Sequence, residues 1–158
     1  TTLTTSTDVS ITGASGNQRL NFNRTNAAGS NGNQFGLIKF HDNNDNQVAG
    51  IEAVRASAVD DADIVFKTRP TGGSVTERVR IDSGGKVLPG ADNTQDLGSS
   101  TKRWANVYSG DLQLSNEGSA NEVDGTWGNF TIQEGEDDLF LINRRNGKKY
   151  KFNLTEVN

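Results

Sequence analysis

Residues 77–116 read ERVRIDSGGKVLPGADNTQDLGSSTKRWANVYSGDLQLSN. The pattern of this stretch is the main basis for predicting the fold. Val79 and Ile81 alternate with charged residues, which is typical of a strand. Residues 83–85, Ser-Gly-Gly, predict a turn, because glycine adopts a positive φ without steric cost. Residues 99–108 begin with two serines and carry large side chains spaced by three or four, which predicts one capped helical turn. Since a full helix fits nowhere in the stretch, it indicates an all-β fold.

Two hairpins are predicted upstream of this stretch. Each consists of two short strand-like runs around a turn that is rich in Asp, Asn, Gly or Pro. The paired runs are residues 35–40 with 48–55, and residues 64–68 with 75–82. Because consecutive runs are expected to pair, this half of the chain is predicted to be a meander of short strands.

A third hairpin is predicted at the C-terminal end around Asn146 and Gly147. Asn-Gly favours a two-residue type I′ turn, in which both residues have positive φ. A two-residue turn sets Arg145 opposite Lys148 and fixes the register of both strands. Both faces of the hairpin then carry large apolar residues. One face has Leu139, Leu141, Tyr150, Phe152 and Leu154, and the other has Phe140 and Ile142. A hairpin that is apolar on both faces needs cover from outside a small module.

The composition points to a chain that does not complete its own core. Of the 158 residues only 32% are hydrophobic, and 18 are glycine. This hydrophobic share is well below that of an ordinary globular domain. The formal net charge is only −4 and strand-like runs recur throughout, so disorder fits less well than oligomerisation does.

Several functional classes lack the residues that they need. The chain has no cysteine and one histidine, and it contains neither a nucleophile elbow nor a phosphate-binding glycine motif, so no enzyme activity and no cofactor are expected. The acidic balance argues against a nucleic-acid partner, and no apolar run approaches the roughly 18 residues of a membrane span. Asp42, Asn44 and Asn46 alternate like calcium ligands, but Gln47 stands where an EF-hand requires glycine, so no metal site is expected.

Three phrases resemble the distal, C-terminal part of bacteriophage tail fibres and related virion fibres, including those of cyanophages. They are ERVRIDSGGKV at residues 77–87, DLGSSTKRWANVYSGDLQLSN at 96–116, and GNFTIQEGEDDLFLINRRNGKKYKFNLTEV at 128–157. The resemblance implies an elongated homotrimer located in the virion, with other tail, baseplate or capsid proteins as partners. The chain then divides into four parts: a leader or attachment arm at 1–20, a β-meander fibre domain at 21–90, a connector with the helical turn at 91–118, and a C-terminal hairpin module at 119–158.

Two functions fit this resemblance. The first is a tail fibre that takes part in host-surface recognition, and the second is a purely structural fibre of the collar, capsid or baseplate. Trp127 and Tyr108 are candidates for stacking on sugar rings. Lys148 and Lys149 are candidates for docking an anionic surface polysaccharide, unless the acidic loop at residues 134–138 neutralises the basic hairpin tip.

A set of large apolar residues is also expected to line the seam between the three chains. Its members are Trp104, Leu114, Phe140 and Ile142.

Overall fold

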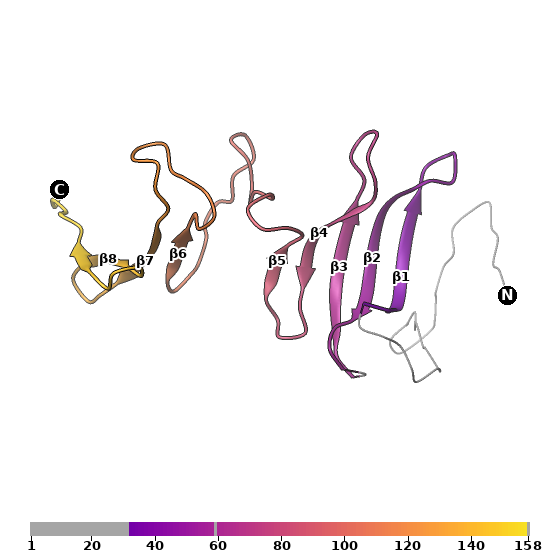
Figure 1. Ribbon diagram of the computed structural model, residues 1–158, viewed down its shortest axis with the longest axis horizontal. Coiled ribbons are helices and arrows are strands. Elements are labelled where there is room, and N and C mark those ends of the chain that lie inside the picture. Colours follow the sequence, from indigo (N-terminus) through magenta and orange to yellow (C-terminus); the bar gives the residue numbers. More distant parts are fainter. Residues whose placement is uncertain (1–31, 59, 158) are drawn as a thin grey trace. The chain divides into compact units, whose positions relative to one another are not determined.

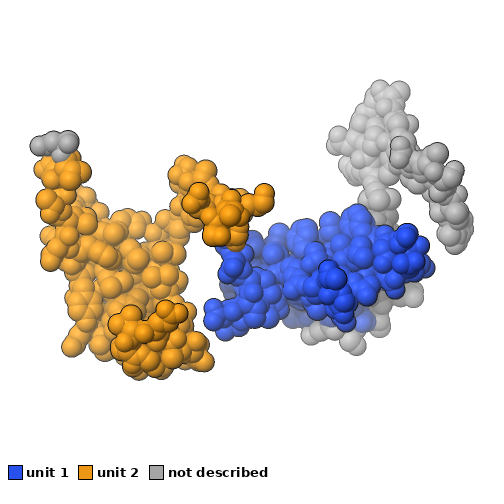
Figure 2. All heavy atoms as spheres, turned by 90° about the horizontal axis from the view of Figure 1, so that it is seen from above, with its two compact units in different colours: residues 1–97 blue, residues 98–158 orange. Residues whose placement is uncertain are grey.

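A computed structural model describes residues 32–58 and 60–157 (Figure 1). This part of the chain is all-β, as predicted: it forms nine antiparallel strands in two sheets and contains no helix. The chain separates into two compact units, one up to Leu97 and one from Gly98 onward (Figure 2). The leader expected at residues 1–20 lies outside the described residues.

The first unit is a five-stranded meander, and both predicted upstream hairpins are confirmed. Each strand pairs with its neighbour in sequence, in the order β1-β2-β3-β4-β5. The strands are β1 (Gln34–His41), β2 (Gln47–Arg55), β3 (Ala62–Thr68), β4 (Thr76–Ile81) and β5 (Val87–Pro89). The predicted Ser-Gly-Gly turn joins β4 to β5, and Gly85 adopts a φ of 86° there.

A β-bulge at Arg78 interrupts the pairing of β3 with β4. Phe66 pairs with Val79, but Lys67 pairs with Glu77, so one extra residue lies on β4. Without the bulge, Glu77 and a residue three positions later would point to opposite faces of the sheet. The bulge therefore brings the side chains of Glu77 and Arg80 to the same face.

The second unit is a four-stranded meander in the order β6-β7-β8-β9. Its strands are β6 (Leu112–Ser115), β7 (Asn129–Glu134), β8 (Leu139–Asn143) and β9 (Lys149–Lys151). Strand β6 falls within the connector expected at residues 91–118, yet it pairs with β7. The structural boundary at Leu97 and Gly98 thus lies inside that connector, and the second unit starts earlier than residue 119.

The predicted helical turn at residues 99–108 is wrong. The Ser99 hydroxyl does accept the backbone N–H of Lys102 at 3.0 Å, which is the expected capping contact. The backbones of Ser99 and Lys102 also bond reciprocally, at 2.9 and 3.2 Å. Because this pairing closes a tight turn around two residues, the carbonyl groups are not free to start an α-helical ladder.

The predicted register of the C-terminal hairpin is also wrong, by two residues. Asn143, not Arg145, lies opposite Lys148, because the Asn143 N–H donates to the Lys148 carbonyl at 2.9 Å. The Asn143 side-chain oxygen accepts the N–H groups of Arg145 and Asn146, which starts the turn earlier. Within this four-residue turn only Gly147 has a positive φ, so the type I′ requirement is not met. A slip of two residues keeps every side chain on its predicted face.

Candidate functional site

One face of the five-stranded sheet is apolar and open. Cross-strand pairing aligns large apolar side chains in two rows across the strands. The first row is Ile38, Ile51, Phe66, Val79 and Pro89, and the second is Ala53, Ile64, Ile81 and Val87. Of these, Ile38, Ile51, Ile64, Phe66, Val79 and Ile81 are 37–42% exposed. In the described part of the chain, these side chains are covered by their neighbours in the sheet but not by a second layer.

An open apolar area of this kind is uncommon on a monomer. Contiguous apolar patches on monomeric proteins rarely exceed a few hundred Å², and larger ones mark interaction sites. Gly36 and Ala53 are small residues within this face, and above them lies an apolar hollow of about 190 Å³. The face therefore offers both an apolar surface and a recess.

The four-stranded sheet has an apolar face as well. Its members come from all four strands: Leu112, Leu114, Phe130, Ile132, Leu139, Leu141 and Tyr150. Leu112, Leu114 and Tyr150 are 45–49% exposed. Leu114, one of the expected seam residues, thus lies on an open apolar surface.

Two other expected seam residues, Phe140 and Ile142, lie on the opposite face of this sheet. Ile142 pairs with Thr131 and is only 9% exposed, so the chain itself already covers it. Phe140 lies against Gly135, where an added Cβ would come within 2.7 Å of its ring. The structure therefore does not bring all four expected residues together. Trp104, the fourth, is exposed in the segment before β6.

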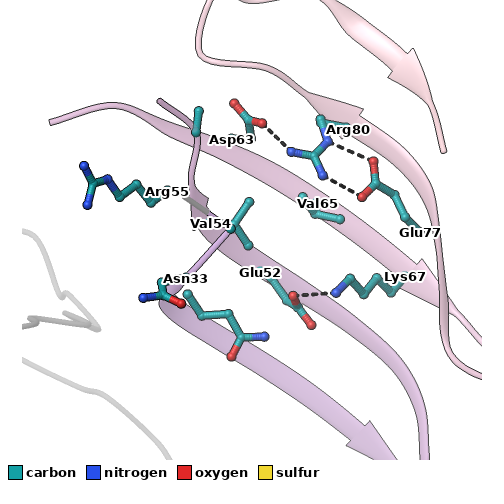
Figure 3. Close-up of a pocket in the computed structure, with 12 residues that line it drawn as sticks. Asn33, Glu52, Val54, Arg55, Asp63, Val65, Lys67, Glu77 and Arg80 are labelled. Atoms are coloured by element: carbon teal, nitrogen blue, oxygen red, sulfur yellow. Dashed lines mark hydrogen bonds and ion pairs between the residues drawn. The ribbon is translucent and has the colours of Figure 1, made fainter. Parts of the chain in front are cut away.

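The other face of the five-stranded sheet is polar, and ion pairs cross it (Figure 3). Lys67 donates to Glu52 over 2.8 Å between neighbouring strands. Arg80 bonds to Asp63 on β3 and, at 2.7 Å, to Glu77 on its own strand. The second of these contacts depends on the bulge at Arg78. The ion pairs thus connect β2, β3 and β4 on one face.

Two groups of this network, Glu52 and Arg80, have shifted pKa values. Burial alone would raise the pKa of Glu52, but hydrogen bonds from Lys67 and Gln34 outweigh it, and the net pKa lies below its usual value. Glu77 first, and then Asp63, raise the pKa of Arg80 above its ordinary value through their hydrogen bonds. Glu52 and Asp63 are only 4% and 6% exposed, so the fold shields both carboxyl groups from water.

An open cavity of about 570 Å³ lies over this polar face. Its lining comes from the start of β1 and from β2, β3 and β4. The charged lining residues are Glu52, Arg55, Asp63, Lys67, Glu77 and Arg80, and Asn33 and Gln34 add amide groups. Sequence reasoning missed this site, because alternating charged residues on a strand are typical of an ordinary solvent-facing surface.

The basic hairpin tip is only partly neutralised by the acidic loop. Lys151 pairs with Asp138 at 2.8 Å. Arg144 donates to the Thr131 hydroxyl. Within the described residues, Lys148 and Lys149 make no ion pair within 4.0 Å. The two lysines expected to meet an anionic polysaccharide are therefore exposed and available.

The two aromatic candidates differ in their surroundings. The guanidinium of Arg145 lies 3.9 Å from the centre of the Trp127 ring and donates to the Trp127 carbonyl at 2.6 Å. One face of this ring is therefore already covered by a cation–π contact. Tyr108 is 94% exposed in the segment before β6. Of the two, Tyr108 has its ring free on both sides.

The aspartate-rich turns have ordinary structural roles. Both side-chain oxygens of Asp42 are engaged within its own turn, where one of them accepts the N–H groups of Asn44 and Asn46 at 2.9 Å. The backbone bond from Asn46 is the main cause that lowers the pKa of Asp42. Among residues 32–58 and 60–157, no group of three or more His, Cys, Asp or Glu side chains is arranged to hold a metal ion.

Comparisons of the chain with protein-family models, with curated proteins and with solved structures give no match. In the described residues there is no helix with the length and apolar character that crossing a membrane requires.

Proposed function

We propose that this protein is a bacteriophage virion fibre, in particular a tail fibre that takes part in host-surface recognition as a parallel homotrimer. Two independent arguments support the proposal. The phrases at residues 77–87, 96–116 and 128–157 resemble virion fibres, and the described chain leaves an apolar face open on each of its two sheets.

The open face of the five-stranded sheet is the observation that carries the proposal. Six large side chains there retain 37–42% of their surface, although all of them lie on paired strands. The same face on two further copies supplies a matching apolar cover, because identical chains around a three-fold axis repeat each contact three times. The polar face with its ion pairs then points away from the axis, where water and a host surface meet it.

The seam of this trimer comes from the open faces and not from Ile142. Its proposed centre on the five-stranded sheet consists of Ile64, Phe66 and Ile81. On the four-stranded sheet, Leu114 belongs to the corresponding contact between chains. Lys148, Lys149 and Tyr108 are the proposed contacts with a host surface, since all three are exposed. Tyr108 supplies a ring for stacking on a sugar, and the lysines supply charge for an anionic group.

The test combines a measurement of the molecular mass in solution with the location of the protein in phage particles. Light scattering at low micromolar concentration is expected to give three times the 17.0 kDa mass of one chain. Gold-labelled antibody against the chain is expected to mark the tail of phage particles in electron micrographs, and the free protein is expected to slow phage adsorption. Labelling at the collar or capsid, without an effect on adsorption, would identify a structural fibre instead. A folded monomer, or a compact dimer, would contradict the proposal.

A further inference from the structure

The cavity over the polar face of the five-stranded sheet has the properties of a ligand site. Its volume of about 570 Å³ lies within the range of roughly 300–1,000 Å³ typical of small-molecule sites. Figure 3 shows side chains from neighbouring strands around it, with the Arg80 guanidinium between Asp63 and Glu77. Strands β2, β3 and β4 position the charged groups, and sites built on strands hold their geometry well.

The charges of the lining balance. Glu52, Asp63 and Glu77 supply three negative charges, and Arg55, Lys67 and Arg80 supply three positive charges. A site that is neutral overall gives no net attraction to a strongly anionic or strongly cationic ligand. The ligand that fits this lining is therefore uncharged.

The lining also disfavours apolar and aromatic ligands. Val65 and Val54 are 1% and 6% exposed, so they lie beneath the polar groups and offer almost no surface to a ligand. None of the lining residues is aromatic, which leaves no ring for a nucleobase to stack on. A ligand in the cavity meets hydrogen-bonding groups nearly everywhere.

These groups have hydrogen-bonding capacity that the internal ion pairs do not use. An ammonium donates three hydrogen bonds, and Lys67, whose side chain is 28% exposed, gives one of them to the buried Glu52. The side-chain amide of Asn33 adds two donors and an acceptor at the start of β1. The side chains of Lys67, Arg80 and Glu77 are 24–30% exposed, so the lining presents donors beside an acceptor. This mixture suits hydroxyl groups, because each of them both donates and accepts.

The burial of the ion pairs supports a role in recognition. Replacing buried ion pairs by apolar side chains is often neutral or stabilising, so such pairs are weak evidence for a contribution to stability. The groups of this network are instead held in position by hydrogen bonds to one another before any ligand arrives. Pre-organisation of this kind reduces the entropic cost of binding.

We infer that this cavity, which we call the polar groove, binds a neutral, hydroxyl-rich saccharide of about two to three sugar units. The groove is distinct from the basic hairpin tip, which has the opposite preference for an anionic partner. The identification of the saccharide as part of a host surface rests on the proposed function. Without an aromatic platform each groove binds weakly, and the three grooves of a trimer compensate through multivalency.

The experiment is ligand-observed NMR with the full chain and three neutral probes, namely maltotriose, mannotriose and triacetylchitotriose. At least one probe is expected to bind at up to about 10 mM, the range of weak single-site affinities. Asn33→Ala and, separately, Glu77→Gln are expected to weaken this binding at least about fivefold, since each removes groove contacts without opening the apolar face. Asn44→Ala is the matched control, because it makes the same change in the turn after β1, and it is expected to leave binding unaltered.

Three outcomes would overturn the inference: none of the neutral probes binds, binding survives both groove variants, or Asn44→Ala weakens it equally. A sulfated trisaccharide serves as the anionic probe. If the protein prefers it to the neutral probes and this preference depends on Lys148, binding is assigned to the hairpin tip, and this outcome also overturns the inference. The proposed function and the polar groove can be refuted independently of each other. A monomer that binds a neutral trisaccharide contradicts only the fibre proposal, whereas a trimer that marks phage tails and binds none contradicts only the groove.

Discussion

The open apolar face gives a prediction that a matched pair of variants can test. Ile64 lies on the open face of the five-stranded sheet, and Leu88 lies on the polar face, opposite Arg80. Both are 38% exposed, and their side chains are isomers. Ile64→Ala and Leu88→Ala thus remove the same atoms from opposite faces of one sheet.

The expected size of the effect follows from the surface that assembly covers. Burying an isoleucine fully stabilises by roughly 1.5–3 kcal/mol, so covering the exposed 38% contributes about 0.6–1.1 kcal/mol per chain. Three chains give about 1.7–3.4 kcal/mol, which is a factor of roughly 16 to 270 in the equilibrium constant for trimer formation. Because dissociation into three monomers depends on the square of the concentration, the midpoint rises by about 4- to 16-fold.

Analytical ultracentrifugation over a dilution series measures this midpoint for each variant. Ile64→Ala is expected to raise it by the calculated factor, and Leu88→Ala is expected to leave it unchanged. Circular dichroism melting at high concentration checks that both variants fold. If both variants shift the midpoint equally, or if neither does, the open face is not the seam and the reasoning from burial is refuted.

Three further predictions concern the bulge, the ion pairs and the hairpin tip. Gly90→Ala is expected to lower the melting temperature markedly, because an added Cβ would lie 2.3 Å from the Glu77 carbonyl oxygen. An unchanged melting curve would contradict this, since it would show that the backbone next to the edge strand β5 shifts at little cost in free energy. Since the pKa of Glu52 lies below its ordinary value of 4.5, its contribution to stability is present above that pH and is lost as the pH falls through the lower, folded value. Melting followed from pH 7 to pH 3 is expected to show this loss in the wild type and a smaller loss in Glu52→Gln; equal losses would argue against the assignment. Replacing Lys148 and Lys149 together by glutamine is expected to weaken binding to an anionic polysaccharide with little change in melting, because exposed lysines contribute at most about 1 kcal/mol to stability. A large loss of folding would contradict that account.

Local patterns predicted most of the strands. The alternation around Val79 and Ile81 and the turn residues between runs were sufficient for the meander, because hairpins between adjacent runs need only short-range information. The alternation does not show where a strand carries an extra residue. The bulge at Arg78 therefore could not be predicted, although it decides that Glu77 meets Arg80.

The two wrong predictions share a physical cause. At Asn143 the side-chain oxygen accepts the Arg145 N–H, and at Ser99 the backbone bonds reciprocally to Lys102, so a local hydrogen bond decides each turn. The sequence shows that such side chains are present, but not which of several competing bonds forms. Asn146 and Gly147 consequently lie in a four-residue turn, and residues 99–108 contain no helix.

The polar groove could have been found in part from the sequence. Once β2 pairs with β3 and β3 with β4, the register sets Glu52 next to Val65 and Val65 next to Arg80. Oppositely charged residues at diagonal positions on neighbouring strands are a recognisable signal. The burial of the carboxylates cannot be recognised from the sequence, because it depends on the conformations in which long side chains cover their neighbours.

The meander order of the strands has a kinetic consequence. Every strand in both sheets pairs with its neighbour in sequence, so the contact order within each sheet is low. Chains of low contact order fold rapidly, whereas association of three chains is slower at low concentration. If the proposed trimer forms, a newly folded chain thus presents its apolar face to solvent for some time before its partners arrive. During this interval the same surface promotes aggregation, so the yield of refolding is expected to fall with rising temperature and to depend on the presence of a chaperone.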